Sequence, residues 1–450
     1  MNNRQLAQRD LEVLWHPCTQ MKDHEDFPPV PIRRGKGVWL EDHDGNRYID
    51  AVSSWWVNLF GHANPRINAA IQEQLETLEH VILAGFSHEP AIELAERLVA
   101  LTPGDLCRCF YADNGSSAVE VALKMSFHCW KNQGVHGKTR FVNLANSYHG
   151  ETLGALAVGD VSLYKQTYGP LLLKPFTAAS PDAWTRKEGE TQADCARRKF
   201  ADMERLLAQH HSEICAVIVE PLVQCAGGMR MYDPLYLTLL RQACDHYQVH
   251  LIADEIAVGF GRTGSLFACE QAHITPDFMC LSKGLTGGYL PLSVVMTTNT
   301  VYQSFYDDYT TLKAFLHSHS YTGNPLACRA ALATLDIFTE DPVLENNRKL
   351  ALCMQASTAH FAEHPHIAEV RQTGMILAIE MVADKNTRTP YPWQQRRGVK
   401  VFRHALTREV LLRPLGNVVY FMPPYVITEQ QIEHLAEVAW EGILKATSET

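Results

Sequence analysis

Apolar runs of strand length alternate, through the middle of the chain, with longer segments whose apolar residues recur at helical spacing. Three of the apolar runs end in a polar residue, and they are 215–220, 249–254 and 278–283. This alternation is typical of βα units around a largely parallel sheet. Because ligands of open α/β sheets bind beyond the carboxyl ends of the strands, the residues that end these runs are candidates for a functional site.

Four further segments have a readable pattern. Residues 116–130 contain good helix formers and follow a turn and cap signal at 113–115, so we expect a helix there. Residues 38–49 are expected to form a hairpin that turns at Asp44 and Gly45. The polar stretches 177–200 and 383–398 contain many charges and turn residues, and we interpret both as surface excursions.

The domain plan follows from this order of elements. A large α/β domain with a mainly parallel sheet is expected at residues 66–335. The segments 1–65 and 336–450 are expected to fold together as a smaller α+β domain built from both termini. No internal repeat or low-complexity linker interrupts this arrangement.

Composition narrows the class of protein. The chain has 450 residues, 46% of them hydrophobic, which is enough for two lobes with substantial cores. The formal net charge of −10 and the lack of a basic run argue against a nucleic-acid partner, so small-molecule substrates are expected. No apolar stretch approaches the roughly 18 residues of a membrane span, and the start does not resemble a signal peptide. We therefore expect no membrane association and a cytoplasmic location.

Neither the cysteines nor the histidines form a recognisable site. The 12 cysteines are scattered without a CxxC pair, which favours buried thiols over a disulfide framework. The 21 histidines include no HExxH motif, and no close pair has a matching set of thiols. No metal is therefore expected.

An enzyme that carries amino groups on an aldehyde cofactor needs a tethering amine, an acid beside the ring nitrogen and a cradle for the phosphate. Lys283 follows an apolar run among small residues, and a partly desolvated lysine is a better nucleophile because its pKa falls. Asp254 ends another such run, and Gly115 and Ser116 open a helix whose N-terminus favours anions. Each has a plain alternative: a solvated loop lysine, a capping aspartate and an ordinary helix cap.

The stretch 259–264 fits the G-x-G-x-x-G pattern of dinucleotide-binding folds. The residues DEIAV at 254–258 separate the apolar part of the preceding strand from its first glycine, and the residues after the motif make a poor crossover helix. We reject the dinucleotide interpretation and expect a loop that holds Arg262 near the cofactor.

Three motifs taken together resemble class III aminotransferases of PLP fold type I: ADEIAVGFGRTG at 253–264, LSKGLTGG at 281–288 and GNP at 323–325. The resemblance spans nearly the whole chain, and it implies pyridoxal 5′-phosphate as cofactor. It implies that Lys283 binds the cofactor covalently and moves the proton, and that Asp254 pairs with the pyridine nitrogen. Tyr148 and Ile256 would pack on the two faces of the ring, and Gly115 and Ser116 would hold the phosphate.

Five further motifs resemble the branch of this family that acts in biotin biosynthesis: WHPCTQM at 15–21, SSWW at 53–56, NSYHGET at 146–152, QCAGGMRMY at 224–232 and RPLGNVVYFMPPY at 413–425. That branch moves an amino group onto 8-amino-7-oxononanoate, usually from S-adenosylmethionine. The residues that the resemblance implies for substrate binding are Trp55, Tyr148, Lys283, Ser318, Arg413, Arg262, Cys18 and Tyr420.

The resemblance also implies a homodimer with shared active sites. His319 and Ser320 occupy the place of a residue pair that completes the phosphate site of the neighbouring subunit. Arg413 would grip the substrate carboxylate with two parallel hydrogen bonds. Glu220 aligns with an acid that the family places near the residue matching Arg262, so a polar pair is expected there.

Two departures leave the amino donor open. Cys18 stands where the S-adenosylmethionine branch usually has tyrosine, and 317–325 reads HSHSYTGNP, which is closer to members that use lysine. The SSWW motif and the region of Tyr420 follow the S-adenosylmethionine branch. The alternatives are the same reaction with lysine, another ω-amino-acid aminotransferase, and a non-catalytic PLP-binding scaffold.

Overall fold

A seven-stranded sheet lies at the centre of the large lobe in the computed structural model, which describes residues 1–448. Its strands, in spatial order, are β4 (Leu106–Ala112), β12 (Ser293–Thr298), β11 (Phe278–Leu281), β10 (His250–Asp254), β7 (Ile214–Val219), β5 (Arg140–Leu144) and β6 (Phe176–Ala178). Strand β12 is antiparallel to both of its neighbours, and the other pairs are parallel. The predicted α/β fold with a mainly parallel sheet is confirmed.

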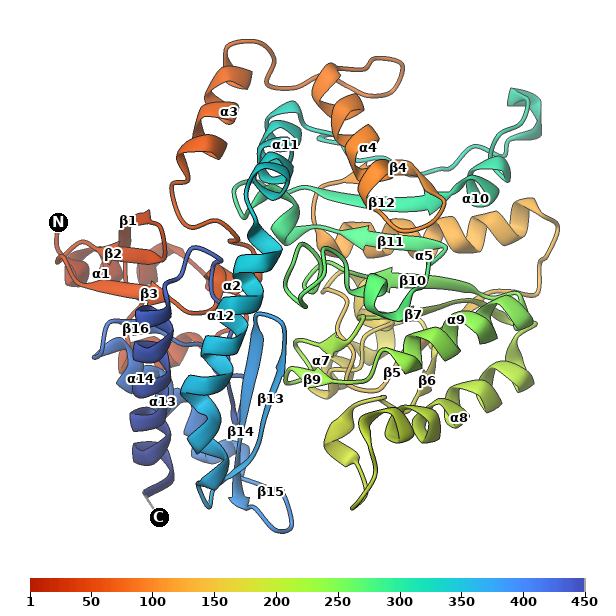
Figure 1. Ribbon diagram of the computed structural model, residues 1–450. Coiled ribbons are helices and arrows are strands. Elements are labelled where there is room, and N and C mark those ends of the chain that lie inside the picture. The colour runs from red at the N-terminus through yellow and green to blue at the C-terminus, as the bar shows by residue number, and fades with distance from the viewer. Residues whose placement is uncertain (449–450) are drawn as a thin grey trace.

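Helices cover both faces of this sheet (Figure 1). Helix α5 (Gly115–Asn132) lies on one face, and α8 (Gln192–His210) and α9 (Leu235–Tyr247) lie on the other. Alternate residues of β11 serve the two faces: Phe278 packs with α5, whereas Met279 joins the opposite core. A strand buried on both faces has a continuous apolar sequence, which explains the runs seen along the chain.

The predicted strands and helix are present at nearly the expected positions. The three apolar runs form β7, β10 and β11, and the helix expected at 116–130 is α5. The side chain of Asn114 caps α5 by accepting a hydrogen bond from the Ser117 amide at 3.1 Å. The interpretation of 177–200 as a surface excursion is wrong for two parts. Residues 180–183 are buried, and α8 begins at Gln192 and buries Phe200. Its many charged residues lie on the exposed face of an amphipathic helix.

The smaller lobe joins the two ends of the chain. The strands β1 (Ile32–Lys36), β2 (Trp39–Asp42) and β3 (Arg47–Asp50) form an antiparallel sheet, and β16 (Val410–Leu411) pairs in parallel with β3. The hairpin expected at 38–49 is therefore present, and it turns through Gly45, whose φ is 90°. The N-terminal segment thus completes a sheet with the C-terminal one.

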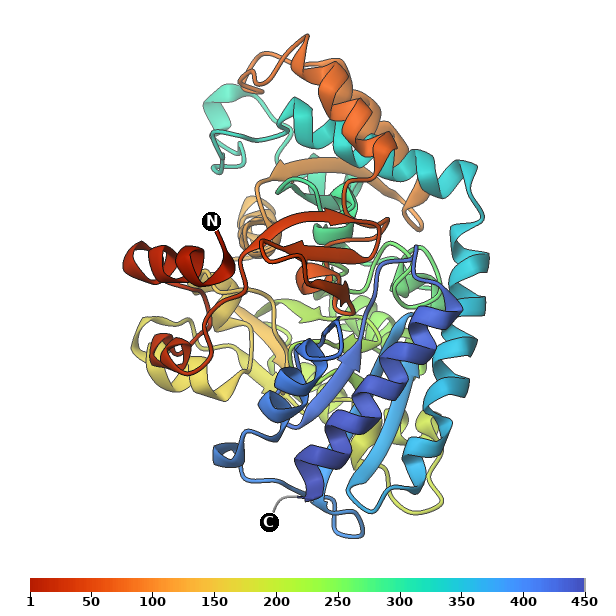
Figure 2. The same ribbon diagram turned by 90° about the vertical axis from the view of Figure 1, so that its left-hand side faces the viewer.

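A second sheet of the smaller lobe contains β13 (Ile367–Thr373), β14 (Ile376–Asp384), β15 (Thr389–Pro390) and β17 (Val418–Phe421). Three helices pack together beside it (Figure 2), and they are α12 (Val343–Thr358), α13 (Arg397–Leu406) and α14 (Glu429–Ser448). The segment that follows β17 contacts the large lobe, because the carbonyl of Pro423 accepts a hydrogen bond from Arg262.

The remaining helices lie around these sheets. Helix α11 (Pro325–Glu340) packs against α3 (Pro65–Leu75) and α4 (Glu89–Leu101). Shorter elements are α1 (Asn3–Val13), α2 (Ser53–Trp56), α6 (Leu153–Ala157), α7 (Ser162–Tyr168), α10 (Asn299–Gln303), β8 (Val223–Gln224) and β9 (Arg230–Met231). Among residues 1–448, no helix has the length and apolar character to cross a membrane.

The division into 1–65, 66–335 and 336–450 stays a prediction, and residues 449–450 lie outside the described part of the chain. Residue 335 falls inside α11, which continues to Glu340. We therefore propose that the second boundary lies between α11 and α12.

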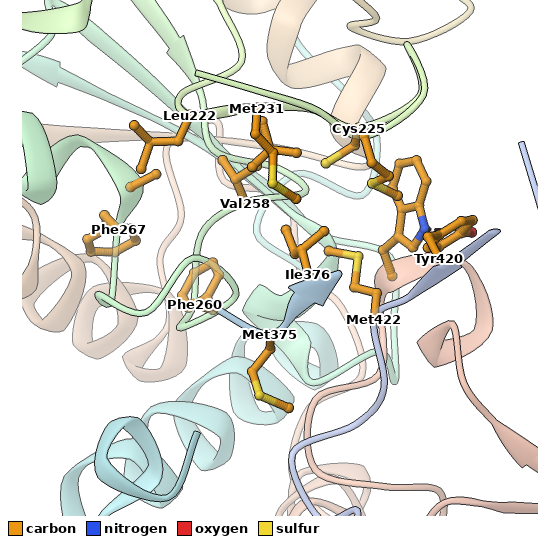
Figure 3. Packing of buried hydrophobic residues seen from close by; sticks show 14 of the residues in the cluster. Leu222, Cys225, Met231, Val258, Phe260, Phe267, Met375, Ile376, Tyr420 and Met422 are labelled. Atoms are coloured by element: carbon orange, nitrogen blue, oxygen red, sulfur yellow. Dashed lines mark hydrogen bonds between the residues drawn. The ribbon is translucent and has the colours of Figure 1, made fainter. Parts of the chain in front are cut away.

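An apolar cluster joins the two lobes (Figure 3). Val258 and Phe260 come from the loop after β10, Ile376 begins β14, and Tyr420 and Met422 come from β17 and the residue just beyond it. All five side chains belong to one continuous buried cluster. Because interiors of this kind are closely packed, the cluster fixes β17 relative to the loop that follows β10.

Candidate active site

A cavity of about 200 Å³ opens at the carboxyl ends of β7, β10 and β11. Six predicted site residues line it: Gly115, Ser116, Tyr148, Asp254, Ile256 and Lys283. The other lining residues are Trp56, Asn114, His149, Gly150, Glu220, Ala257 and Val258. The cavity lies where ligands bind in open α/β sheets, so the strand-end residues are brought together as expected.

Lys283 lies two residues beyond the end of β11, with a left-handed φ of 47°. Burial lowers the pKa of its amine, and nearby Cys225 and Asp254 oppose that shift. The Nζ atom lies 4.5 Å from the centre of the Trp56 ring. A lysine with a lowered pKa is neutral more often, so its lone pair is available to attack a carbonyl carbon.

Asp254 is held by a residue that the sequence reasoning did not single out. Its Oδ2 lies 2.7 Å from Nδ1 of His149, and its Oδ1 accepts a hydrogen bond from the Ile256 amide at 3.1 Å. Asp254 and His149 are both buried. Among the described residues, Nε2 of His149 has no hydrogen-bond partner. The only sequence signal for His149 was its place beside Tyr148 in the motif NSYHGET.

The N-terminus of α5 forms a candidate anion cradle. Gly115 and Ser116 begin the helix, and Gly150 closes against them with a φ of 126°. A Cβ at Gly150 would lie 2.1 Å from Oγ of Ser116 and 3.0 Å from its Cα. The close approach requires glycine, and the free amides of a helix N-terminus suit a phosphate. The amine, the buried acid and this cradle together fit a pyridoxal phosphate group.

Tyr148 and Glu220 are linked through the backbone. The Tyr148 amide donates to Oε2 of Glu220 at 3.0 Å, and the Cys225 amide donates to Oε1 at 2.9 Å. Burial raises the pKa of Glu220 to about 7; the field of His149 lowers it and that of Asp254 raises it. Burial also raises the pKa of the Tyr148 phenol, which therefore stays protonated. Its hydroxyl donates to Glu151 at 3.1 Å.

Cys18 lies beside Glu151 and does not itself line the cavity, so its role in substrate binding stays a prediction. Its Sγ is 3.6 Å from Oε1 of Glu151 and 3.3 Å from the hydroxyl of Tyr164, on α7. The sequence reasoning missed Tyr164, which is 146 positions away along the chain. A phenol is thus present next to the cysteine that replaces the usual tyrosine.

The SSWW motif has an unusual backbone. Ser53, Ser54, Trp55 and Trp56 all have left-handed φ values, of 51°, 46°, 72° and 74°. Such a conformation costs roughly 1–2 kcal/mol per residue for L-amino acids. Trp56 lines the cavity and is buried, whereas Trp55 is 45% exposed. The predicted role of Trp55 in substrate binding stays a prediction, and Trp56 is the tryptophan in the cavity wall.

Arg413 and Tyr420 lie beside these two indoles rather than in the cavity wall. The guanidinium of Arg413 is exposed, and its Cζ is 5.3 Å from the centre of the Trp55 ring. The Tyr420 hydroxyl accepts a hydrogen bond from Nε1 of Trp56 at 3.0 Å. Trp56 therefore lies against the Lys283 amine, and the adjacent Trp55 lies against the Arg413 guanidinium.

The expected pair between Glu220 and Arg262 is absent from the structure. Arg262 is fully buried and donates to main-chain carbonyls, to Pro423 at 2.7 Å and to Asn58 at 2.9 Å. Both terminal nitrogens of the guanidinium thus donate to main-chain carbonyls where the two lobes meet, and neither pairs with Glu220. It ties the segment after Trp56 to the segment after β17.

Residues 317–320 do not line the cavity of this chain. His319 is half-buried, with Nδ1 at 3.0 Å from Asp113 and Nε2 at 2.7 Å from Nε2 of His317. Ser318 and Ser320 are exposed. Their roles in substrate binding and in a partner's phosphate site stay predictions.

The sequence profile of the family described as "Aminotransferase class-III" matches residues 20–441. The chain belongs to this family. Membership makes the chain an aminotransferase that depends on pyridoxal phosphate.

Relatives along the full length share a common name. Adenosylmethionine-8-amino-7-oxononanoate aminotransferase from Helicobacter pylori is 50% identical, with 95% of each chain covered. The protein of that name from Geobacter sulfurreducens is 43% identical, with 96% of each chain covered.

Solved structures agree. The Methanocaldococcus jannaschii protein of the same name has a TM-score of 0.93 and 38% identity, with 99% of each chain covered. An omega transaminase from Pseudomonas jessenii, in complex with PMP, has a TM-score of 0.94 and 29% identity, with 98% of each chain covered. The fold is therefore common to aminotransferases with different names, and substrate choice must come from the side chains around the cavity.

Proposed function

We propose that this enzyme transfers an amino group to 8-amino-7-oxononanoate to give 7,8-diaminononanoate, in biotin biosynthesis, with S-adenosylmethionine as donor. The observation that carries the choice of acceptor is that Trp56 lies against the Lys283 amine while the adjacent Trp55 lies against the Arg413 guanidinium. An aliphatic chain along Trp55 and Trp56 would place a carboxylate at the guanidinium and a distant carbonyl at the amine. The names of the full-length relatives support the same reaction.

Each cavity residue has a proposed task. Pyridoxal phosphate, when bound, supplies the aldehyde that carries the amino group and a ring that withdraws electrons. Gly115 and Ser116 bind the phosphate, and Asp254 keeps a proton on the ring nitrogen. Tyr148 and Ile256 hold the ring between them.

Lys283 moves the proton. Its Nζ sits in the cavity with a lowered pKa, so it can accept a proton from the α-carbon of the donor and return it to the acceptor. Trp56 covers the amine on one side and keeps water away from it. His149 orients Asp254 through the contact between Nδ1 and Oδ2.

We also propose that four residues, Cys18, Tyr148, Glu151 and Tyr164, form one side of the entrance to the cavity and receive the polar end of the substrates. The Glu151 carboxylate accepts from the Tyr148 phenol and is within reach of the Cys18 thiol. A carboxylate next to two phenols suits a cationic amine. Tyr164 then supplies the hydroxyl that residue 18 lacks.

We further propose that the enzyme is a homodimer with shared active sites, in which His319 and Ser320 reach the phosphate of the partner. Large apolar side chains are exposed on the same segment, and they are Tyr306, Tyr309, Leu312, Leu316 and Tyr321. Contiguous exposed apolar surface is typical of interfaces between proteins. Sedimentation of the wild type against Tyr309→Asp tests this, since a monomeric wild type would refute it.

The experiment for the function is a product assay. The holoenzyme is incubated with 8-amino-7-oxononanoate and either S-adenosylmethionine or lysine, and 7,8-diaminononanoate is detected by mass spectrometry. Arg413→Ala serves as the test variant. Arg408→Ala serves as the control, since Arg408 is a partly exposed arginine paired with Glu441 in the small lobe.

Product with S-adenosylmethionine supports the proposal, and the KM for the keto acid should rise in Arg413→Ala alone. Product with lysine alone would support the proposed acceptor and would show that lysine, and not S-adenosylmethionine, is the amino donor. Absence of product with both donors, together with turnover of ω-amino acids, would refute the proposed acceptor.

A further inference from the structure

The left-handed turn at 53–56 is a strained element at the active site. Four consecutive residues with side chains share this conformation, which non-glycine residues normally adopt only singly. The turn is closed by its own backbone, since the Trp56 amide donates to Val52 at 2.9 Å and the Val57 amide donates to Ser53 at 3.0 Å. Strained backbone persists only where its surroundings hold it, and it is frequent at functional sites.

Asp50, at the end of β3, stabilises the turn from the side of the N-terminal sheet. Its side chain is fully buried, and its Oδ1 accepts a hydrogen bond from the Ser54 amide at 2.9 Å. Its Oδ2 accepts from the Ser54 hydroxyl at 2.7 Å and lies 3.0 Å from Nε2 of His62. The other ring nitrogen of His62 lies 3.3 Å from the amide nitrogen of Asn58, which can only donate. His62 therefore donates to Asp50, and the carboxylate receives three hydrogen bonds.

The C-terminal segment also holds the turn in place. The Ser53 hydroxyl donates to the carbonyl of Met422 at 2.7 Å, and the Trp56 indole donates to Tyr420. Gly288, with a φ of 87°, closes the exit of the turn, because a Cβ there would lie 2.8 Å from the carbonyl carbon of Val57. The turn is thus clamped between the N-terminal sheet, β17 and the large lobe.

We propose that Asp50 is a positioning residue of the active site, which holds the left-handed turn so that Trp56 faces the Lys283 amine and Trp55 faces Arg413. Successive side chains of a left-handed turn point in directions that a right-handed turn cannot reproduce. The same carboxylate therefore fixes the wall of the cavity at Lys283 and the apolar path to the guanidinium. The part concerning Arg413 rests on the proposed function.

The test substitution is Asp50→Asn. The amide keeps the size of the side chain but places a donor opposite the donors of Ser54 and His62. Asp42→Asn is the matched control. Asp42 is also buried in the N-terminal sheet and accepts hydrogen bonds from Asn46 and Tyr48, but none of its bonds reaches the turn.

The first readout uses the cofactor-free chain and needs no substrate. Near-ultraviolet circular dichroism reports indoles held in a fixed asymmetric environment, and Trp56→Phe defines the share of Trp56 in the spectrum. We expect Asp50→Asn to lose that share and Asp42→Asn to keep it. A spectrum of Asp50→Asn that matches Asp42→Asn would overturn the proposal.

The second readout is kinetic. We expect Asp50→Asn to lower kcat through Lys283 and to raise the KM of the keto acid through Arg413, with a combined loss in kcat/KM of about 10- to 100-fold. The kcat/KM of Asp42→Asn should stay within about twofold of that of the wild type, even if its melting temperature falls as far as that of Asp50→Asn. Equal losses in both variants would mean that Asp50 serves only stability, and the proposal would be wrong.

A second variant covers the case in which Asp50→Asn does not fold. Ser54→Ala removes only the hydroxyl that donates to Asp50, so a partial loss of the Trp56 signal is expected, and a spectrum and kinetics like the wild type would overturn the proposal. The spectra also separate this inference from the proposed function. A wild type that does not aminate 8-amino-7-oxononanoate would refute that function, while the cofactor-free spectra would still decide the role of Asp50.

Discussion

The hydrogen bond between Trp56 and Tyr420 gives a quantitative test of how the two lobes hold the cavity wall. Nε1 of Trp56 lies 3.0 Å from the Tyr420 hydroxyl, and the rings meet edge to face at 6.3 Å. Both side chains are buried, and among the described residues neither polar atom has another hydrogen-bond partner. Removing one partner therefore leaves the other polar group buried and unpaired.

The magnitudes follow from that geometry. Tyr420→Phe removes one hydroxyl and leaves the indole N–H unpaired, which should cost about 1–3 kcal/mol of unfolding free energy. Trp56→Phe leaves the phenol unpaired and also removes packed ring atoms, so about 2–4 kcal/mol is expected. The double variant has no unpaired group, and its cost should fall short of the sum by about 1–2 kcal/mol.

The assay is denaturant unfolding of the four cofactor-free proteins at one protein concentration. A control cycle pairs Trp56→Phe with Tyr111→Phe, whose hydroxyl donates to the Ala91 carbonyl at 2.6 Å in the large lobe. That cycle should be additive within about 0.5 kcal/mol. Additivity in the Trp56 and Tyr420 cycle as well would refute the reasoning, because the buried hydrogen bond would then carry no coupling.

Three further predictions concern the cofactor, the donor and pH. Gly150→Ala should weaken cofactor binding at least about tenfold, because its Cβ would displace Ser116. A fluorescence titration of the cofactor measures this change. Gly169→Ala is the control, because a Cβ there meets no atom within 4 Å. Tyr164→Phe should raise the KM of the amino donor about 3- to 10-fold in steady-state assays, with Tyr168→Phe on the same helix unchanged. Because the folded-state pKa of Glu220 is raised from 4.5 to about 7, folding binds a proton, and the cofactor-free chain should lose about 3 kcal/mol of stability as pH rises through that window. Glu220→Gln should flatten this dependence in denaturant unfolding at about pH 5 and about pH 8, and an unchanged slope would contradict the assignment.

The central sheet and half of the cavity could be predicted from local patterns. Apolar runs that ended in Glu220, Asp254 and Lys283 had to be strands buried on both faces, and parallel strands bring such ends to one edge. The cap signal before Gly115 likewise specified a helix N-terminus within a few residues. In each case, the information lies within one element and the geometry of that element carries it to the site.

Polar stretches were harder to interpret. The segment before Phe200 has so many charges that its helical face was not recognised, although α8 buries three of its residues in the first nine positions. An amphipathic helix with a narrow apolar stripe and a charged surface loop have similar composition. The packing of α8 against α9 decided between them.

The sequence by itself determined the strands, the start of helix α5 and the family, because periodicity, caps and motifs act over a few residues. Only the tertiary structure decided that His149 holds Asp254, that Arg262 serves main-chain carbonyls at the lobe joint, and that Trp56 forms the cavity wall. Partners for these groups come from more than a hundred positions away, as with Arg262 and Pro423. No glycine in the sequence marks the left-handed turn that directs Trp56. Buried contacts with Asp50 and Met422 compensate the strain of this turn, and the local preferences of its residues do not.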